Sequence, residues 1–147
     1  YNYLLLFIST AYLQNNNIYK IPIDFNHFHG LDYKNSVLKV GVCLGTGRYC
    51  KDYKFKYYSN LSNMRLIGYE EEYFGNAVHD GAYTKSVNLL TNTFEIEEHQ
   101  YNTKTDQDVI INNISARATT PVITLTSFDE KTLTYLEELG RNYFKNQ

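Results

Sequence analysis

Short segments in which apolar and polar residues alternate recur along this chain. Residues 18–25 and 93–97 follow a period of two, which is typical of strands with one buried and one exposed face. The chain has 15 Tyr and 8 Phe, and aromatic side chains favour strands over helices. Further strand-like runs occur at residues 27–32, 37–42, 65–73, 80–89, 109–111 and 122–125. The sequence therefore predicts a mainly β protein.

Two of these segments carry more specific expectations. The continuous apolar run at residues 109–111 is typical of a short buried segment. Residues 51–61, in contrast, are polar and rich in Tyr, and we expect a loop there.

Three consecutive acidic residues, Glu70, Glu71 and Glu72, fall within a strand-like segment. Successive side chains of a strand point to opposite faces, so these carboxylates cannot all converge on one ion. We expect them at a solvated edge.

The C-terminal segment changes to a helical period. Its apolar stripe consists of Leu133, Leu136 and Leu139. Ser127 or Asp129 can cap the N-terminus of such a helix, and Gly140 can end it. We expect a short C-terminal helix that packs on the core of the sheet.

Length and charge limit the classes of protein that remain. The chain has 147 residues, 43% of them hydrophobic, which suits one globular domain with a core. Its formal net charge is -2 and no basic run stands out, so we expect no nucleic-acid partner.

The N-terminus contains an apolar run at residues 4–8 that extends weakly to Leu13. This run is too short to span a membrane. Residues 1–14 are interpreted as the remnant of a signal peptide, and a buried first strand is the alternative. The folded part would then cover residues 15–147.

The two cysteines, Cys43 and Cys50, enclose a short loop with two glycines, which is flexible enough to let a disulfide form. Such a bond, together with the glycosylation sequons at Asn60 and Asn113, is compatible with a secreted, extracellular or lysosome-like lumenal protein. We expect no metal and no other cofactor, because no second Cys pair is present to complete a zinc site.

Taken in order, several segments resemble the N-terminal lobe of the pepsin-like aspartic proteases (peptidase family A1). At the family's hydrophobic-Asp-Thr-Gly motif this chain has Leu31, Asp32, Tyr33 and Lys34, of which only Leu31 and Asp32 match. A small Cys-to-Cys loop follows in the family, as it does here. Further on, the family's flap hairpin is matched by Tyr73, Phe74 and Gly75.

The resemblance implies a single pepsin-like lobe, half of the acid protease fold, with Asp32 as catalytic residue and Tyr73, Phe74 and Gly75 as the substrate-binding flap. It also implies aspartic endopeptidase activity on a peptide or protein substrate. That chemistry uses two carboxylates that share a proton, and the family supplies one from each lobe. No Asp-Thr-Gly or Asp-Ser-Gly is present, so activity would require a missing second lobe or a homodimer.

Tyr33 and Lys34 stand where the family has a small hydroxyl and a glycine. A cation beside Asp32 favours the ionised carboxylate and opposes a shared proton. We therefore expect a lone lobe to be catalytically impaired. The alternatives are a non-catalytic secreted module that holds a peptide as an added strand near Tyr73, and an unrelated small β protein.

Overall fold

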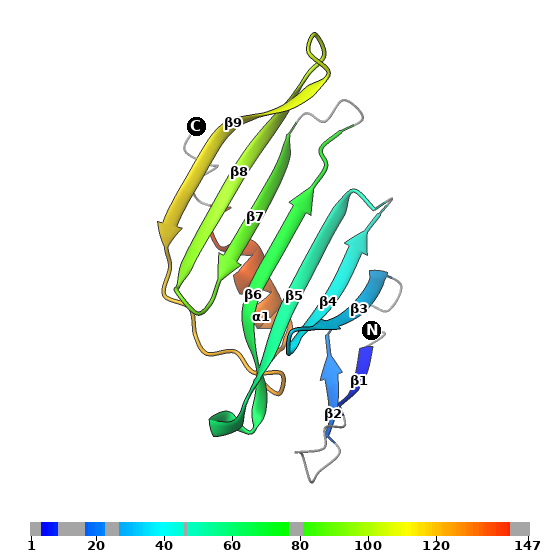
Figure 1. Cartoon of the computed structure of the whole chain (residues 1–147), viewed down its shortest axis with the longest axis vertical. Helices are drawn as coiled ribbons and strands as arrows, with labels where there is room; N and C mark the ends of the chain where they lie inside the picture. The colour runs from blue at the N-terminus through cyan, green and yellow to red at the C-terminus, as the bar shows by residue number, and fades with distance from the viewer. Residues whose placement is uncertain (1–3, 9–16, 23–26, 46, 77–80, 142–147) are drawn as a thin grey trace.

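The computed structural model describes residues 4–8, 17–22, 27–45, 47–76 and 81–141. Its main element is a seven-stranded antiparallel sheet in which each strand pairs with the next along the chain (Figure 1). The strands are β3 (Phe28–Lys34), β4 (Val37–Leu44), β5 (Tyr49–Tyr58), β6 (Asn63–Tyr73), β7 (Ala82–Asn88), β8 (Thr93–Asn102) and β9 (Gln107–Arg117). A 3-10 turn, η2 (Ser59–Leu61), joins β5 to β6.

A separate hairpin precedes the sheet. It pairs β1 (Leu4–Ile8) with β2 (Asn17–Ile21) in antiparallel fashion. The apolar run at residues 4–8 thus forms a strand. The signal-peptide interpretation of residues 1–14 stays a prediction, and residues 1–3 and 9–14 lie outside the described residues.

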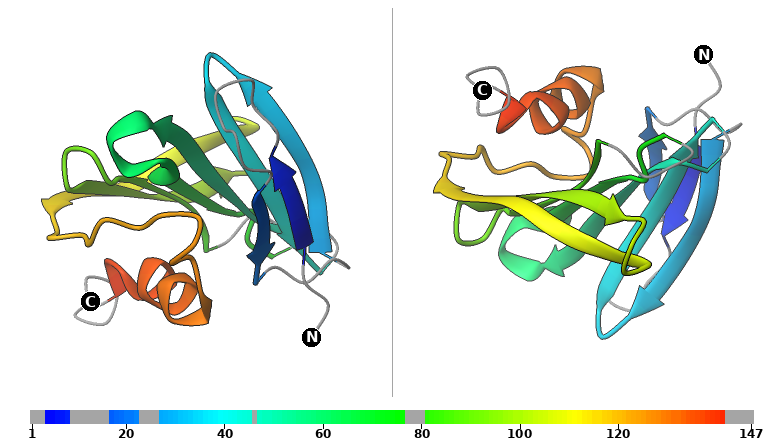
Figure 2. Two further views of the ribbon diagram at one scale, coloured as in Figure 1. Left: turned by 90° about the horizontal axis from the view of Figure 1, so that it is seen from below. Right: turned by 90° about the horizontal axis from the view of Figure 1, so that it is seen from above.

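One face of the sheet is covered by the β1–β2 hairpin and by helix α1 (Glu130–Glu138), which lie on the same side of it (Figure 2). We call this side the covered face and the other side the open face. Ile21 of β2 and Leu136 of α1 are fully buried in one core with the apolar side chains of the covered face. The prediction of a mainly β protein with a short C-terminal helix is confirmed, whereas its assignment to a pepsin-like lobe stays a prediction.

The segment between β9 and α1 returns to the middle of the sheet. The backbone N–H of Leu66 donates to Ile123 O at 2.8 Å, and the N–H of Leu125 donates to Met64 O at the same distance. The run at residues 122–125 therefore makes a single bridge to β6 rather than a full strand. Phe128 follows, and its ring lies 5.3 Å from the ring of Phe55 in the core.

Helix α1 begins as its sequence predicts. Asp129 is the N-cap, and its carboxylate accepts a 2.9 Å hydrogen bond from the backbone N–H of Thr132. The hydroxyl of Thr132 donates to the same carboxylate, and the two hydrogen bonds lower the pKa of Asp129. Just after the helix, Gly140 has φ +81, and a Cβ there would lie 2.5 Å from Ile96 Cδ1. Glycine suits this position because it adopts a positive φ without strain and lets the chain lie against the side chains of β8.

Strand β5 corrects the expectation of a loop at residues 51–61. Tyr53 and Phe55 are buried and alternate with the half-exposed Asp52 and Lys54, which is a strand pattern. The buried position before Tyr53 is occupied by Lys51 rather than by an apolar residue. Because this charged residue breaks the apolar alternation, the sequence looks more polar than the strand is.

Candidate functional site

A row of charged residues crosses the covered face of the sheet. Lys51 on β5 lies opposite Glu71 on β6, and Glu71 lies opposite Lys85 on β7. The side chains of Glu71 and Lys85 are only 3% and 4% exposed, and Lys85 Nζ lies 2.8 Å from Glu71 Oε2. Charged side chains are almost never buried so fully unless they are paired. The expectation of a solvated acidic edge is therefore wrong for Glu71, which lies in the interior.

Four groups donate hydrogen bonds to the Glu71 carboxylate. Its Oε1 accepts from the hydroxyls of Tyr49 at 2.6 Å and Tyr83 at 2.5 Å. Its Oε2 accepts from the hydroxyl of Tyr69 at 2.6 Å and from Lys85 Nζ. A carboxylate offers about four acceptor positions, so all of them are occupied. We call these five residues the Glu71 cluster.

Lys85 connects this cluster to the end of helix α1. Its ammonium group also donates to the backbone carbonyls of Leu136 at 2.9 Å and Glu137 at 3.0 Å. The last carbonyls of a helix have no partner within the helix, and a cation is favourable there. Lys51 Nζ binds the Glu137 carboxylate as well. The sheet thus binds the C-terminal end of α1 through two lysines.

The protonation states in the cluster follow from burial and from these partners. Burial opposes ionisation of Glu71, but the charge of Lys85 and the hydrogen bonds from Lys85, Tyr49 and Tyr69 outweigh it and hold its pKa below the ordinary value. Burial, with the negative charge of Glu71, raises the pKa values of Tyr49, Tyr69 and Tyr83. Glu71 is therefore ionised and the three hydroxyls remain protonated donors.

This arrangement leaves the Glu71 cluster without a free reactive group. The carboxylate accepts four hydrogen bonds, and the three N–H bonds of Lys85 are used by Glu71, Leu136 and Glu137. Neither group is available to activate a water molecule or a substrate. Buried polar networks that are fully satisfied make a fold rigid and specific. We interpret the Glu71 cluster as a structural link between the sheet and α1.

A cavity of about 360 Å³ lies between this cluster, the C-terminal end of α1 and strands β8 and β9. Its floor includes Tyr83 and Lys85, and its walls include Ile111, Leu139 and Arg141. Ile111 belongs to β9, which is the last strand of the sheet. The cavity therefore lies next to an edge of the sheet.

Strand β9 exposes a run of apolar side chains. Among the described residues, no strand pairs with its outer side. Val109, Ile110 and Ile111 are 43%, 51% and 59% exposed. The expectation that this run is buried is wrong, because it lies on an edge strand that has a neighbour on one side only.

A β-bulge in β9 lies at two neighbouring isoleucines. Glu98 pairs with Asn112 and His99 with Ile110, so Ile111 has no partner in the register. Ile110 pairs with His99, whereas the extra residue Ile111 lines the cavity on the covered side. Bulges redirect side chains in this way at sheet edges and near binding sites.

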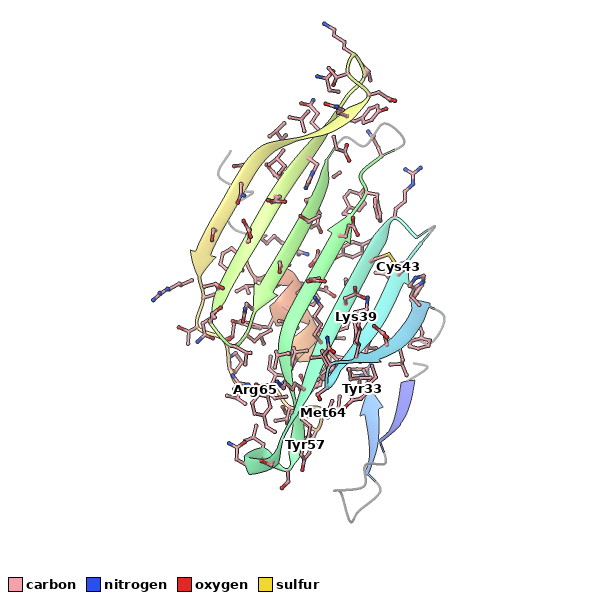
Figure 3. The ribbon with its side chains drawn as sticks, viewed as in Figure 1. Tyr33, Lys39, Cys43, Tyr57, Met64 and Arg65 are labelled. Atoms are coloured by element: carbon pink, nitrogen blue, oxygen red, sulfur yellow. A yellow bond between two sulfur atoms is a disulfide. The ribbon has the colours of Figure 1, made fainter. Side chains whose placement is uncertain are left out.

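Asp32, the catalytic residue that the resemblance implies, lies on the opposite edge strand. It is exposed on β3, and its partner across the hairpin is the cation Lys39. Its neighbour Tyr33 lies at the other end of the β3–β4 hairpin from Cys43 (Figure 3). The register β3-β4-β5-β6 places Asp32 level with Gly68, five residues before Tyr73.

The residues expected to form a flap continue the sheet. Tyr73 ends β6 and pairs with Tyr49 of β5. The backbone N–H of Phe74 donates to Arg48 O at 2.9 Å, and Arg48 Nη1 donates to Gly75 O at 3.5 Å. These bonds hold the segment beside the β4–β5 connection. The structure thus does not bring Tyr73, Phe74 and Gly75 together with Asp32.

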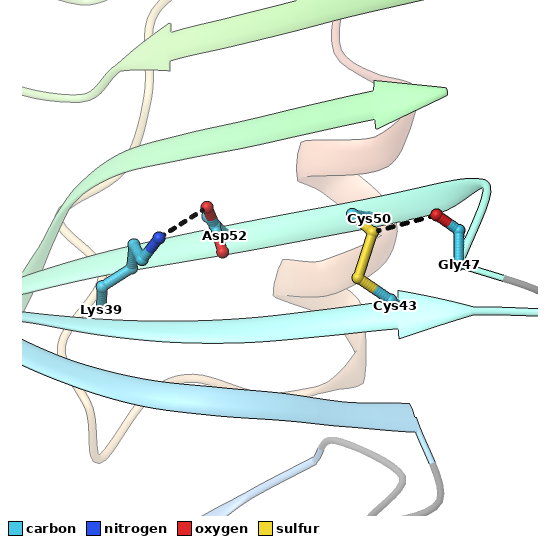
Figure 4. Close-up of a disulfide and its surroundings, with 5 residues drawn as sticks. All are labelled: Lys39, Cys43, Gly47, Cys50 and Asp52. Carbon is cyan, nitrogen blue, oxygen red and sulfur yellow. Dashed lines mark hydrogen bonds and ion pairs between the residues drawn. A yellow bond between two sulfur atoms is a disulfide. The ribbon is translucent and has the colours of Figure 1, made fainter. Parts of the chain in front are cut away.

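The disulfide between Cys43 and Cys50 is confirmed. The two residues face each other in the β4–β5 register, with their Cα atoms 4.1 Å apart (Figure 4). On the same hairpin, Lys39 Nζ binds Asp52 Oδ2 at 3.2 Å on the open face. Closing so short a loop stabilises the folded state by about 2.5 kcal/mol on the chain-entropy estimate.

The chain has no match among models of known protein families, among curated proteins or among solved structures. Within the described ranges, no cluster of His, Cys, Asp and Glu side chains could hold a metal ion. None of the described helices is long and apolar enough to cross a membrane.

Proposed function

We propose that the chain is a non-catalytic binding module that takes an extended segment of a partner protein or peptide as an added strand on β9. One observation carries this proposal, namely the exposure of Val109, Ile110 and Ile111 on an eleven-residue edge strand. Long edge strands with exposed apolar side chains pair readily with another chain, and many peptide-binding domains use this mode. The backbone supplies affinity, and alternate side chains supply specificity.

The charge around β9 selects a basic partner. On the open face, Asn113 Nδ2 donates to the carboxylates of Glu95 and Glu97, both at 3.2 Å. Across β8, β9 and their connection, carboxylates outnumber cations: Glu95, Glu97, Glu98, Asp106 and Asp108 against Lys104 and Arg117. A partner strand with Lys or Arg on its open-face side would be attracted to this edge.

Aspartic endopeptidase activity, which the pepsin-like resemblance implies, is the second hypothesis. It would require a second carboxylate beside Asp32, from a missing lobe or from another copy of the chain. The exposed position of Asp32 opposite Lys39 supports catalytic impairment of the lone lobe. We also propose a secreted or lumenal location, which the disulfide supports because such bonds persist in oxidising compartments.

Selection from a phage library of random dodecapeptides on the immobilised chain tests the binding proposal. We expect enriched peptides that alternate Lys or Arg with apolar residues. Ile110→Lys should abolish their binding, because a lysine on an edge strand opposes pairing and repels a basic peptide. Leu31→Lys, which adds the same charge to the exposed edge strand β3, is the matched control and should bind normally.

Two results would contradict the proposal. One is the absence of any enrichment over a blank surface, and the other is equal binding by the wild type and by Ile110→Lys. Hydrolysis of peptides at acid pH that disappears in Asp32→Asn would support the endopeptidase hypothesis instead.

A further inference from the structure

We infer that the cavity between β9 and the C-terminal end of α1 is a specificity pocket for one large apolar or aromatic side chain of the added strand. This inference rests on the proposed function, because it assigns the side chains of the same partner. It adds the chemical class of the partner residue that points to the covered face of the sheet.

The position of the cavity matches the reach of an added strand. Successive side chains of a strand point to opposite faces, so every second residue of a partner on β9 would point toward α1. Ile111, which the bulge turns to that side, forms part of the cavity wall together with Leu139 and Arg141 after the helix. One partner side chain beside Ile111 would therefore enter the cavity from the edge of the sheet.

The size of the cavity suits a single bulky side chain. Its volume of about 360 Å³ falls at the lower end of ligand pockets, which range over roughly 300–1,000 Å³. A small side chain such as alanine would leave most of this space unfilled. The wall offers apolar surface from Ala82, Ile111 and Leu139, against which an apolar side chain can pack.

The charges of the lining favour a neutral occupant. Glu71 and Lys85 neutralise each other, and their hydrogen-bonding positions are filled by the Glu71 cluster and by α1. Lys51 neutralises Glu137 in the same way. These pairs leave no free charge for a charged side chain, and burying one there would be costly. The buried Nε2 of His99, which also lines the cavity, has no hydrogen-bond partner among the described residues and can take a neutral polar group.

The two remaining charged groups of the lining have opposite signs. Glu98 accepts a 3.0 Å hydrogen bond from Asn112 Nδ2, and Arg141 is exposed at the outer end of the cavity. Together they add no net charge. The lining thus favours an apolar side chain. It also allows one polar contact at its rim, such as the hydroxyl of a tyrosine would make.

The two faces of the added strand then have different requirements. The open face, with Glu95 and Glu97, attracts Lys or Arg, and the covered face takes an apolar or aromatic residue. The partner motif is a basic residue alternating with apolar residues, of which one is large.

A synthetic peptide array tests the pocket. The probes are fluorescein-labelled heptapeptides of the pattern Lys-x-Lys-x-Lys-x-Lys, in which one x at a time is Ala, Leu, Phe, Tyr, Lys or Glu and the other two are Val. Fluorescence polarisation measures their affinity for the chain. At one x position we expect Phe or Tyr to bind at least about tenfold more tightly than Ala, from the apolar surface buried.

Two tryptophan variants on the two edge strands test whether the preference depends on the cavity. Ile111→Trp places a bulky ring in the cavity wall and should reduce that preference to less than about twofold, because the space is taken. Leu31→Trp adds the same ring to the other edge strand, β3, and should leave the preference unchanged. The two wild-type residues are 59% and 47% exposed, so both variants should fold, which circular dichroism checks.

The possible outcomes distinguish failure of the pocket inference from failure of the strand-addition proposal. If no peptide of the array binds at millimolar concentration, the proposed basic strand on β9 is wrong. If peptides bind but no position prefers a large apolar residue, or if Ile111→Trp retains the preference, the pocket inference is overturned while strand addition stands. A preference for Lys or Glu at the position that responds to Ile111→Trp would overturn the apolar character of the pocket.

Discussion

The Glu71 cluster and the edge of β9 belong to the same sheet but differ in how fully their polar groups are paired. In the cluster, a buried carboxylate and a buried ammonium group have every hydrogen-bonding position filled. At the edge, the outer backbone groups have no partner strand among the described residues, and three apolar side chains are exposed. Shifted pKa values often mark functional sites, but structural ion pairs shift them as well. Here the strongly shifted groups serve the fold, and the edge is available for binding.

The largest expected effect comes from breaking the cluster. Glu71→Ala leaves the buried charge of Lys85 without its partner and three tyrosine hydroxyls without their acceptor, so we expect a loss of about 3–5 kcal/mol of unfolding free energy. Glu70→Ala is the matched control, because it removes the neighbouring carboxylate, which binds Lys54 on the half-exposed open face. It should cost less than about 1 kcal/mol.

Urea denaturation followed by tyrosine fluorescence measures both variants. Equal losses in Glu71→Ala and Glu70→Ala would mean that burial does not distinguish these neighbouring carboxylates, and the structural role of the cluster would be refuted.

The dependence of stability on pH provides a second, intermediate effect. The pKa of Glu71 is lower in the folded chain than in the unfolded chain, so the unfolded chain takes up a proton first as the pH falls. The contribution of Glu71 is fully present above its unfolded pKa of about 4.3 and is lost as the pH falls through the lower folded value.

Unfolding free energies of wild type and Glu71→Gln at a series of pH values check this sign. The wild type should lose more stability than Glu71→Gln between neutral pH and acid, and the two curves should approach each other below the unfolded pKa. A difference that stays constant or widens toward acid pH would show that the folded state does not favour the ionised carboxylate.

The smallest effect on stability is expected at the edge. Ile110→Lys replaces an exposed side chain on an edge strand and should change the unfolding free energy by about 0.5 kcal/mol or less. The same variant should nevertheless lose peptide binding. A loss of stability like that of a core substitution would mean that Ile110 is covered in the folded chain, and β9 would not be a free edge.

The sequence predicts those elements whose pattern is local. The alternation at residues 93–97 locates β8, the leucine stripe and Asp129 locate α1, and the spacing of the cysteines agrees with the disulfide. Strand β5 was missed because Lys51 occupies a buried position. That position can be understood only from Glu137, which binds Lys51 from helix α1.

Most of the candidate site could not be predicted from the sequence. The period of a strand places Glu71 on the same face as Tyr69 and Tyr73, which is a signal for burial that could have been used. The exposure of Val109 to Ile111 has no such signal, because an edge strand and a central strand can have the same residues. Which strand lies at the edge depends on the pairing order of the whole sheet.

Amide hydrogen exchange, read residue by residue by NMR, tests most directly whether β9 rather than the edge at Asp32 binds the partner. The probe is the heptapeptide that binds best in the array, at saturating concentration. Strand addition predicts slower exchange at alternate amides of β9, those that point outward, with no change in β3 (Phe28–Lys34). Protection around Asp32 and Tyr73, with β9 unchanged, would contradict the account and favour a cleft like that of the aspartic proteases.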